Sequence, residues 1–343
     1  MTCFGKGSGI SPGLFSSWYH CQMSACFFIG SIPIEGKLVL APMDGITSHP
    51  FRLISRNLGS AFSVSEFLLP TDILRGHPHL EERVFFTHAE RPFGYQLLDN
   101  NPEAMLQAAQ KLMSREPDFL DINLGCPARS VCNRGAGAAL LKQPDKAGQI
   151  ISYLSRHLNL PITAKIRLGW DDQSRNYREI AQILEDSGVA AITVHARTRK
   201  QSHSGMTDLD AIGEIKQMVS VPVIANGSIR TIADVDRVFS YTQCDAVMIG
   251  RGAVRNPWIF TGMDRADVPP EVVLNGIIQH FNAMISFFGE RRGILLFRKH
   301  LIKYLEPYHL PRAQMLAMIT CEDHQQLIAL LNECTPALYP LRN

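Results

Sequence analysis

Residues 119–141 read FLDINLGCPARSVCNRGAGAALL, and this stretch decides how the rest of the chain is interpreted. Its beginning, Phe119–Asn123, has the pattern of a strand buried on both faces, as in parallel sheets. The strand runs straight into Gly125-Cys126-Pro127 and a glycine-rich loop. Gly125 permits a tight turn and Pro127 stiffens the exit, so we expect the Cys126 thiol to be held at the C-terminal end of the strand, where α/β folds keep their chemistry. A buried structural cysteine is the alternative.

Short apolar runs alternate with amphipathic segments from Lys37 onward. Helical patterns fill many of the gaps between the runs, and no GxGxxG motif follows the first of them. This alternation favours a closed barrel over an open doubly wound sheet, so we predict an α/β fold, a (β/α)8 TIM barrel over residues 37–262. The candidate strands are Leu38–Ala41, Phe62–Ser65, Phe93–Leu97, Phe119–Asn123, Ile162–Ile166, Ala191–His195, Val221–Ala225 and Ala246–Gly250.

Only helical patterns follow the linker at Asp264–Pro270. They cover Glu271–Phe288, Gly293–Glu306, Pro311–Met318 and His324–Asn332, so residues 270–343 are predicted to form a small all-helical domain. Within it, residues 290–312 are basic, with Arg291, Arg292, Arg298, Lys299, Lys303 and Arg312 against Glu290 and Glu306. Such a run is either a solvated helix face or a surface for nucleic-acid phosphates.

Residues 1–36 differ in composition from the rest of the chain. They are rich in Gly, Ser, Cys and aromatic residues and have no helical period, so we expect a poorly ordered N-terminal extension. Their most apolar stretch, Ala25–Ile34, is interrupted by Gly30 and Pro33 and is far shorter than the roughly 20 residues that span a bilayer. We therefore predict no membrane association.

Composition places few limits on function. The formal charge of +2 over 343 residues is too mild to prove or exclude a nucleic-acid partner. The eight cysteines are irregularly spaced, without paired CxxC units, which fits free thiols in a reducing cytoplasm better than a disulfide scaffold or a zinc site. We expect a cytoplasmic monomer without bound metal.

Polar side chains stand at the C-terminal ends of most predicted strands, where barrels place functional groups. They are Gln96, Asn123, Lys165, Arg167, His195, Arg197 and Asn226, together with the backbone of Ala41–Met43 and of the glycine loops at 226–228 and 250–252. An unpaired buried polar group costs roughly 1–3 kcal/mol, so a ligand should satisfy these groups.

The two glycine loops indicate the kind of ligand. Asn226-Gly227-Ser228 and Gly250-Arg251-Gly252 follow the last two strands, where these barrels bind phosphate through backbone N–H groups and arginine. Gln96 could face the polar edge of an isoalloxazine ring and Lys165 its N1/O2 locus, which favours FMN. A sugar-phosphate substrate would explain the loops but not Gln96 and Lys165 so well.

Cys126 could act beside a reduced flavin in two ways. A thiol with a pKa near its usual value of about 8.5 is mostly protonated at neutral pH and can give a proton opposite a hydride. That pairing suits reduction of a carbon–carbon double bond conjugated to a carbonyl. A nucleophilic thiol would instead need an adjacent base, for which His195 is the only histidine at a strand end.

Six segments follow one another along the chain: LAPMDGITSHPFR, DINLGCPARSV, AKIRLGW, TVHARTR, PVIANGSI and DAVMIGRGAVRNPWIF. In this order they resemble the FMN-dependent tRNA-dihydrouridine synthases of bacterial type, over about residues 37–304. The resemblance implies an FMN-binding barrel, a helical domain that binds tRNA, and NADPH as reductant, with NADH as the other possibility. The implied reaction reduces the C5=C6 bond of specific tRNA uridines to dihydrouridine.

The resemblance also implies roles for single residues. Cys126 matches the proton donor to uracil C5. The residues of this chain that resemble the family's flavin contacts are Pro42, Met43, Asp44, Gln96, Lys165, His195, Asn226, Gly227, Ser228, Gly250 and Arg251. Asn123 and Arg197, together with His195, match residues that bridge flavin and uracil. The segment FRKHLIKYL, with Arg298, Lys299 and His300, resembles the tRNA-binding motif in the C-terminal region of the family.

Three places depart from the family's pattern. Ser228 stands where an aspartate is frequent, Arg129 and Ser130 where a lysine is common, and His203 where an aromatic residue is usual. Two other functions stay open at this point. One is an FMN-dependent reductase of free pyrimidines, similar to the dihydroorotate dehydrogenases, which would not need a basic helical domain. The other is a non-catalytic tRNA-binding module, which would carry no flavin.

Overall fold

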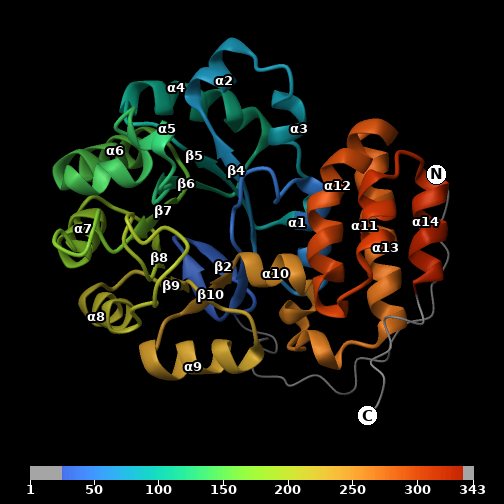
Figure 1. The fold of residues 1–343 in the computed structure, drawn as a ribbon. Coiled ribbons are helices and arrows are strands. Elements are labelled where there is room, and N and C mark those ends of the chain that lie inside the picture. The colour runs from blue at the N-terminus through green and yellow to red at the C-terminus, as the bar shows by residue number, and fades with distance from the viewer. Residues whose placement is uncertain (1–24, 335–343) are drawn as a thin grey trace.

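The computed structural model describes residues 25–334. Eight parallel strands form one sheet that curves into a barrel, with helices arranged around its outside (Figure 1). The (β/α)8 barrel predicted from the sequence is therefore confirmed. In the order of their pairing the strands are β3 (Leu38–Leu40), β10 (Ala246–Ile249), β9 (Val223–Asn226), β8 (Ala191–His195), β7 (Ile162–Arg167), β6 (Phe119–Leu124), β5 (Phe93–Leu97) and β4 (Ser63–Leu68).

The barrel closes between β3 and β4 without a regular ladder. The backbone N–H of Ala61 donates to the carbonyl of Leu38 over 2.7 Å. The backbone N–H of Leu40 donates to the hydroxyl of Ser60 over 2.9 Å. These contacts bring the first two strands together, so the C-terminal ends of all eight strands surround one mouth.

The outer helices follow the strands in the predicted alternation, and side chains fix where some of them begin. Asn101 accepts a hydrogen bond from the N–H of Ala104 at the start of α4, and Thr231 with Asp234 forms a capping box at α9. The helices are α1 (His49–Asn57), α2 (Pro70–Arg75), α3 (Leu80–Val84), α4 (Pro102–Leu112), α5 (Arg129–Cys132), α6 (Pro144–His157), α7 (Tyr177–Asp186), α8 (Asp210–Met218), α9 (Ile232–Thr242) and α10 (Arg251–Arg255). Short 3-10 turns cover His88–Glu90, Met113–Arg115, Gly137–Lys142, Pro257–Thr261, Arg265–Asp267 and Glu306–Tyr308.

A β-hairpin lies at the N-terminal end of the barrel. β1 (Phe27–Ile29) pairs antiparallel with β2 (Ile32–Ile34), and Ile29 and Ile34 are completely buried in a cluster with Phe62 and Phe119. Burying this apolar face stabilises the hairpin, so the expectation that residues 1–36 are poorly ordered is wrong for residues 25–36. Residues 1–24, on which the rest of that expectation falls, lie outside the described residues.

The cysteines differ in state. Cys126, Cys132, Cys244, Cys321 and Cys334 are free thiols. Cys26, just before the hairpin, is disulfide-bonded, so the expectation of free thiols is wrong for this residue. Irregular spacing argues against a disulfide scaffold, but it does not exclude a single bond.

The C-terminal helices pack around a second apolar core beside the barrel (Figure 1). They are α11 (Pro270–Phe288), α12 (Glu290–Leu305), α13 (Arg312–Thr320) and α14 (His324–Glu333). No strand occurs between residues 270 and 334, as the sequence predicts. The domain bounds at 37–262 and 270–343 stay predictions, and residues 335–343 lie outside the described part. Within the described residues, no helix is long and apolar enough to cross a bilayer.

Candidate active site

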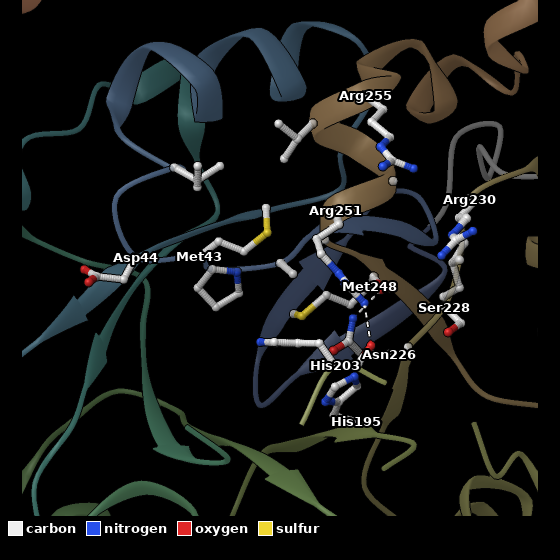
Figure 2. A pocket seen from close by; sticks show the side chains of 18 of the residues that line it. Met43, Asp44, His195, His203, Asn226, Ser228, Arg230, Met248, Arg251 and Arg255 are labelled. Atoms are coloured by element: carbon white, nitrogen blue, oxygen red, sulfur yellow. Dashed lines mark hydrogen bonds between the residues drawn. The ribbon is translucent and has the colours of Figure 1, made fainter. Parts of the chain in front are cut away.

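A cavity of about 890 Å³ opens at the C-terminal ends of the strands and reaches α12. Parallel strands end at the same edge, so residues far apart in sequence meet there. Figure 2 shows Met43, His195, Asn226 and Arg251 around this space. The wall contains the predicted residues Pro42, Met43, Asp44, Gln96, Asn123, Cys126, Lys165, His195, Asn226, Gly227, Ser228, Gly250 and Arg251.

The Cys126 thiol is held by the turn that follows β6. The side-chain oxygen of Asn123 accepts hydrogen bonds from the N–H of Gly125 over 3.1 Å and of Cys126 over 2.9 Å. Gly137, at φ +59°, lies so close behind that a Cβ there would be 3.1 Å from the Cβ of Cys126. Burial raises the pKa of the Cys126 thiol above its ordinary value. Cys126 is therefore a protonated, well-positioned thiol at neutral pH.

A chain of hydrogen bonds fixes the amide groups beneath this turn. The side-chain N–H of Asn123 donates to Gln96 over 2.7 Å, and the side-chain N–H of Gln96 donates to Asp121 over 2.7 Å. The hydroxyl of Thr163 donates to the other Asp121 oxygen over 2.6 Å. Because Asp121 accepts from Gln96, the oxygen of Gln96 must face Asn123, which in turn orients the Cys126 turn.

Lys165 supplies an amine whose protonation is sensitive near neutral pH. Its Nζ donates to the side-chain oxygen of Asn226 over 3.0 Å, and the Asn226 amide donates to the carbonyl of Met248 over 2.7 Å. Burial in the barrel, reinforced by the Arg167 guanidinium, lowers the pKa of Lys165 to about 8. An anionic group placed against this amine would favour its charged form.

The cavity wall is strongly cationic. Among the described residues that form it, Asp44 is the only carboxylate, while the cations are Lys165, Arg167, Arg230, Arg251, Arg255, Arg265, Lys299 and Lys303. Burial lowers the pKa of Arg167 to about 10. Burial first, and then Lys165 and Arg167, lowers the pKa of His195 far below its ordinary value, so its ring is neutral. This charge balance calls for an anionic ligand.

The loop after β9 has the backbone of an anion-binding turn. Gly227 has φ +134°, and a Cβ there would lie 3.0 Å from the Thr207 side chain and 3.2 Å from the His195 ring, so only glycine fits. Ser228 follows in the left-handed region, at φ +53°. Its hydroxyl accepts from Arg197 Nη2 over 2.6 Å. Successive N–H groups of such a turn can bind phosphate.

Arg197 is the one predicted barrel residue that does not line the cavity. It is 4% exposed, lies behind the wall and holds the carbonyl of Gly205 over 2.6 Å. Its Nη1 has no partner within residues 25–334. Arg197 therefore supports the Ser228 turn from behind, and the predicted bridging contact with uracil does not fit this position.

Several wall residues are absent from the predicted set. Arg230 directly follows the segment PVIANGSI, and Arg255 lies within DAVMIGRGAVRNPWIF. Both are therefore close in sequence to the glycine loops, and this closeness could have predicted their place in the cavity wall. Lys303 reaches the cavity because α12 packs against α10, and Arg265 comes from the linker before α11. His203 comes from the loop after β8. Nothing in the local sequence marks Arg265, whereas Lys303 belongs to the basic run of residues 290–312 and only its position at the cavity depends on tertiary packing.

The three residues of α12 predicted to contact tRNA differ in their exposure and their partners. Lys299 is exposed, lines the cavity and donates to the Gly45 carbonyl over 3.0 Å. Arg298 is half-buried and donates to the Cys321 carbonyl over 3.2 Å. His300 is 1% exposed and packs against Phe51 with ring centroids 4.8 Å apart. The prediction that His300 contacts tRNA is wrong, since helix periodicity turns its ring into the protein, and Arg298 is held within the helical region.

The fold and its mouth define a class of protein, a (β/α)8 barrel with a cationic cavity and a protonated thiol at the C-terminal ends of its strands. A family model described as "Dihydrouridine synthase (Dus)" matches residues 39–337. The chain therefore belongs to the dihydrouridine synthase family, oxidoreductases that act on tRNA uridines, and the resemblance seen in the sequence is confirmed.

Two curated relatives support this assignment. The chain is 36% identical over 319 residues to "tRNA-dihydrouridine synthase B" of Xanthomonas campestris pv. campestris, covering 90% of this chain and 96% of the relative. It is 37% identical over 287 residues to "tRNA-dihydrouridine synthase B" of Pasteurella multocida, covering 81% and 86%. Among solved structures, histamine dehydrogenase from Rhizobium sp. 4-9 matches with a TM-score of 0.55 at 11% identity, over 75% of this chain and 50% of that one, which supports the fold alone.

Proposed function

We propose that this protein reduces the C5=C6 bond of specific uridines in tRNA to 5,6-dihydrouridine, with FMN as hydride donor and NADPH as reductant. The observation that supports this most is the presence of Cys126, Lys165 and both glycine loops in one cavity. The loops would hold the FMN phosphate, with Arg251 as a cation beside it. Lys165 and Gln96 would face the polar edge of the flavin ring.

The role of Cys126 follows from its protonation. When bound, reduced FMN supplies a hydride to uracil C6. Cys126 gives its proton to C5, and the thiolate then takes a proton back from solvent, so the residue ends unchanged. The raised pKa of the thiol keeps the acid form available at neutral pH. A positioned general acid of this kind contributes about 10²- to 10⁴-fold in rate.

A nucleophilic role for Cys126 has less support. A thiol nucleophile needs a base within hydrogen-bond reach, and no histidine of residues 25–334 makes a hydrogen bond to the Cys126 sulfur. Burial also raises the pKa of the thiol, whereas an activated nucleophile needs it lowered.

The choice of NADPH over NADH is supported by cations beyond those that one phosphate needs. Arg230 lies beside Ser228 (Figure 2), Arg251 donates to the His203 carbonyl over 3.2 Å, and Arg255, Arg265 and Lys303 also line the cavity. Glu306 pairs with Arg255 over 2.8 Å and with Lys303 over 3.3 Å, which balances only part of this charge. An arginine near the nucleotide is how proteins accommodate the 2′-phosphate of NADP.

The substrate would enter from the side of the cavity that α12 forms. Lys299 and Lys303 lie there and can meet phosphates, which set affinity and register without reading sequence. The uridine must leave its stack to reach Cys126, at a cost of a few kcal/mol in a stacked loop. One chain contributes every group in this scheme, so we also propose that the protein acts as a monomer, in the cytoplasm.

The test is dihydrouridine content, measured by mass spectrometry of nucleosides, in unmodified tRNA incubated with FMN-loaded protein and NADPH. We expect dihydrouridine in tRNA and none in a parallel reaction with free uridine and orotate. Product from the free pyrimidines alone would favour a small-molecule reductase. A purified protein that binds tRNA but takes up no FMN would favour a binding module.

A further inference from the structure

Lys299 and His300 are neighbours on α12, and both contact the barrel. Lys299 Nζ donates to the carbonyl of Gly45 over 3.0 Å. The ring of His300 packs against Phe51 of α1, with ring centroids 4.8 Å apart. Of these two contacts, the Lys299 hydrogen bond is the one that reaches the turn after β3, Met43–Thr47.

The turn that Lys299 holds, Met43–Thr47, is cross-linked by hydrogen bonds and forms part of the cavity wall. The N–H groups of Ile46 and Thr47 both donate to the Met43 carbonyl over 3.0 Å, and the Thr47 hydroxyl accepts from the Met43 N–H over 2.9 Å. Met43 also touches the phosphate-type loop, because a Cβ on Gly250 would lie 3.3 Å from the Met43 sulfur. Met43 and Arg251 line the same space (Figure 2). A shift at Gly45 would therefore be felt where the flavin is proposed to bind.

The Gly45 carbonyl accepts a hydrogen bond from the Lys299 ammonium. Gly45 has φ +70°, and a Cβ there would lie 3.1 Å from Lys299 Nζ, so the close approach depends on glycine. Arg83 holds the preceding residue, Asp44, over 3.1 Å. Lys299 and Arg83 therefore each hold one residue of this turn through a side-chain contact.

We propose that Lys299 is a positioning residue, which fixes the Met43–Thr47 turn against the flavin from the helical region. This rests on the proposed function, which places FMN in the cavity. The role differs from the tRNA contact that the basic run suggests, because it acts before any tRNA binds. Hydrogen bonds to charged groups are among the stronger ones in proteins, so removing the Lys299 ammonium should have a measurable effect on the cofactor alone.

The test uses the full-length protein and FMN without tRNA. Lys299→Met keeps the aliphatic stem and removes the donor, and we expect a shifted visible absorption spectrum of bound FMN and a dissociation constant about 10-fold higher. The matched control is Arg291→Gln, an exposed cation at the other end of α12, which should leave both quantities unchanged.

The outcomes separate the possible roles. If Lys299→Met binds FMN with the wild-type spectrum and affinity and loses only tRNA binding, Lys299 is an ordinary substrate contact and the proposal is overturned. A wild-type protein that binds no FMN would contradict the proposed function itself, and the positioning role with it.

Discussion

The two ends of the barrel are built from opposite kinds of residue. At the N-terminal end, Ile29 and Ile34 of the hairpin are completely buried among aromatic side chains. At the mouth, burial instead lowers the pKa values of Lys165 and Arg167, which means that their charged forms are held there at a cost in free energy. Apolar burial contributes about 1.5–3 kcal/mol per large side chain. The N-terminal end of the barrel, called the floor below, therefore stabilises the fold, while the mouth holds buried charged groups at a cost in free energy where a ligand can meet them.

The largest effect is expected at the mouth, from Cys126→Ala. This variant should lose about 10²- to 10⁴-fold of the rate of dihydrouridine formation, because the proton donor is gone. FMN content and melting temperature should stay at wild-type values, since the floor is untouched. The matched control is Cys132→Ala, whose thiol lies 3.6 Å from the Cys126 carbonyl and outside the cavity wall. Equal rates for Cys126→Ala and wild type would refute the assignment of the acid.

The opposite pattern is expected at the floor, from Ile34→Ala. Truncating this completely buried side chain should lower the free energy of unfolding by about 2–5 kcal/mol, measured by denaturant titration. The rate per folded molecule should not change. Phe28→Ala is the control, because Phe28 is 53% exposed and its removal should cost less than about 0.5 kcal/mol. A loss of rate in stably folded Ile34→Ala would break the separation between the two ends.

A smaller effect is expected from pH, through the protonation of Lys165 at the mouth. Lys165, with a pKa of about 8, is charged below that pH and neutral above it. The charged amine is the form that suits the polar edge of the flavin, so the dissociation constant for FMN should be flat below pH 7 and rise above pH 8, by at most about tenfold per pH unit. Fluorescence titration of FMN measures this. Lys165→Met should bind more weakly with no such rise, and a rise that persists in this variant would assign the titration to another group.

Local motifs explain why the mouth could be predicted and the floor could not. The strand ends carry Asn123, Cys126 and Lys165 in order, and parallel pairing brings them together whatever the loops do. The hairpin is harder to predict because Gly30 and Pro33 interrupt its apolar run. In the structure, Gly30 turns at φ +60° and Pro33 faces outward on the short β2, so neither disrupts the pairing.

The wrong prediction for His300 on α12 has a different cause. The many cations of this helix draw attention away from the regular spacing of its apolar residues, which shows the buried face. Phe297, His300, Leu301 and Tyr304 recur at the spacing of one helix face, and all four are buried. This pattern is present in the sequence and places His300 inward. The same period leaves Lys299 outside. The apolar face therefore separates the two neighbours, whereas the count of positive charges does not.

The smallest effect is expected at Arg298, where the comparison extends to the helical region. Its guanidinium donates to the Cys321 carbonyl, and its Nε is buried without a partner in the described part of the chain, so it serves packing rather than RNA. Arg298→Gln should lower the melting temperature but leave the slope of log affinity for tRNA against log salt unchanged. Removal of a cation that binds one phosphate would reduce that slope by about 0.7–0.9. A reduction of that size would show that Arg298 binds a tRNA phosphate. It would also mean that a half-buried cation can bind phosphate, as the cations at the mouth are proposed to do.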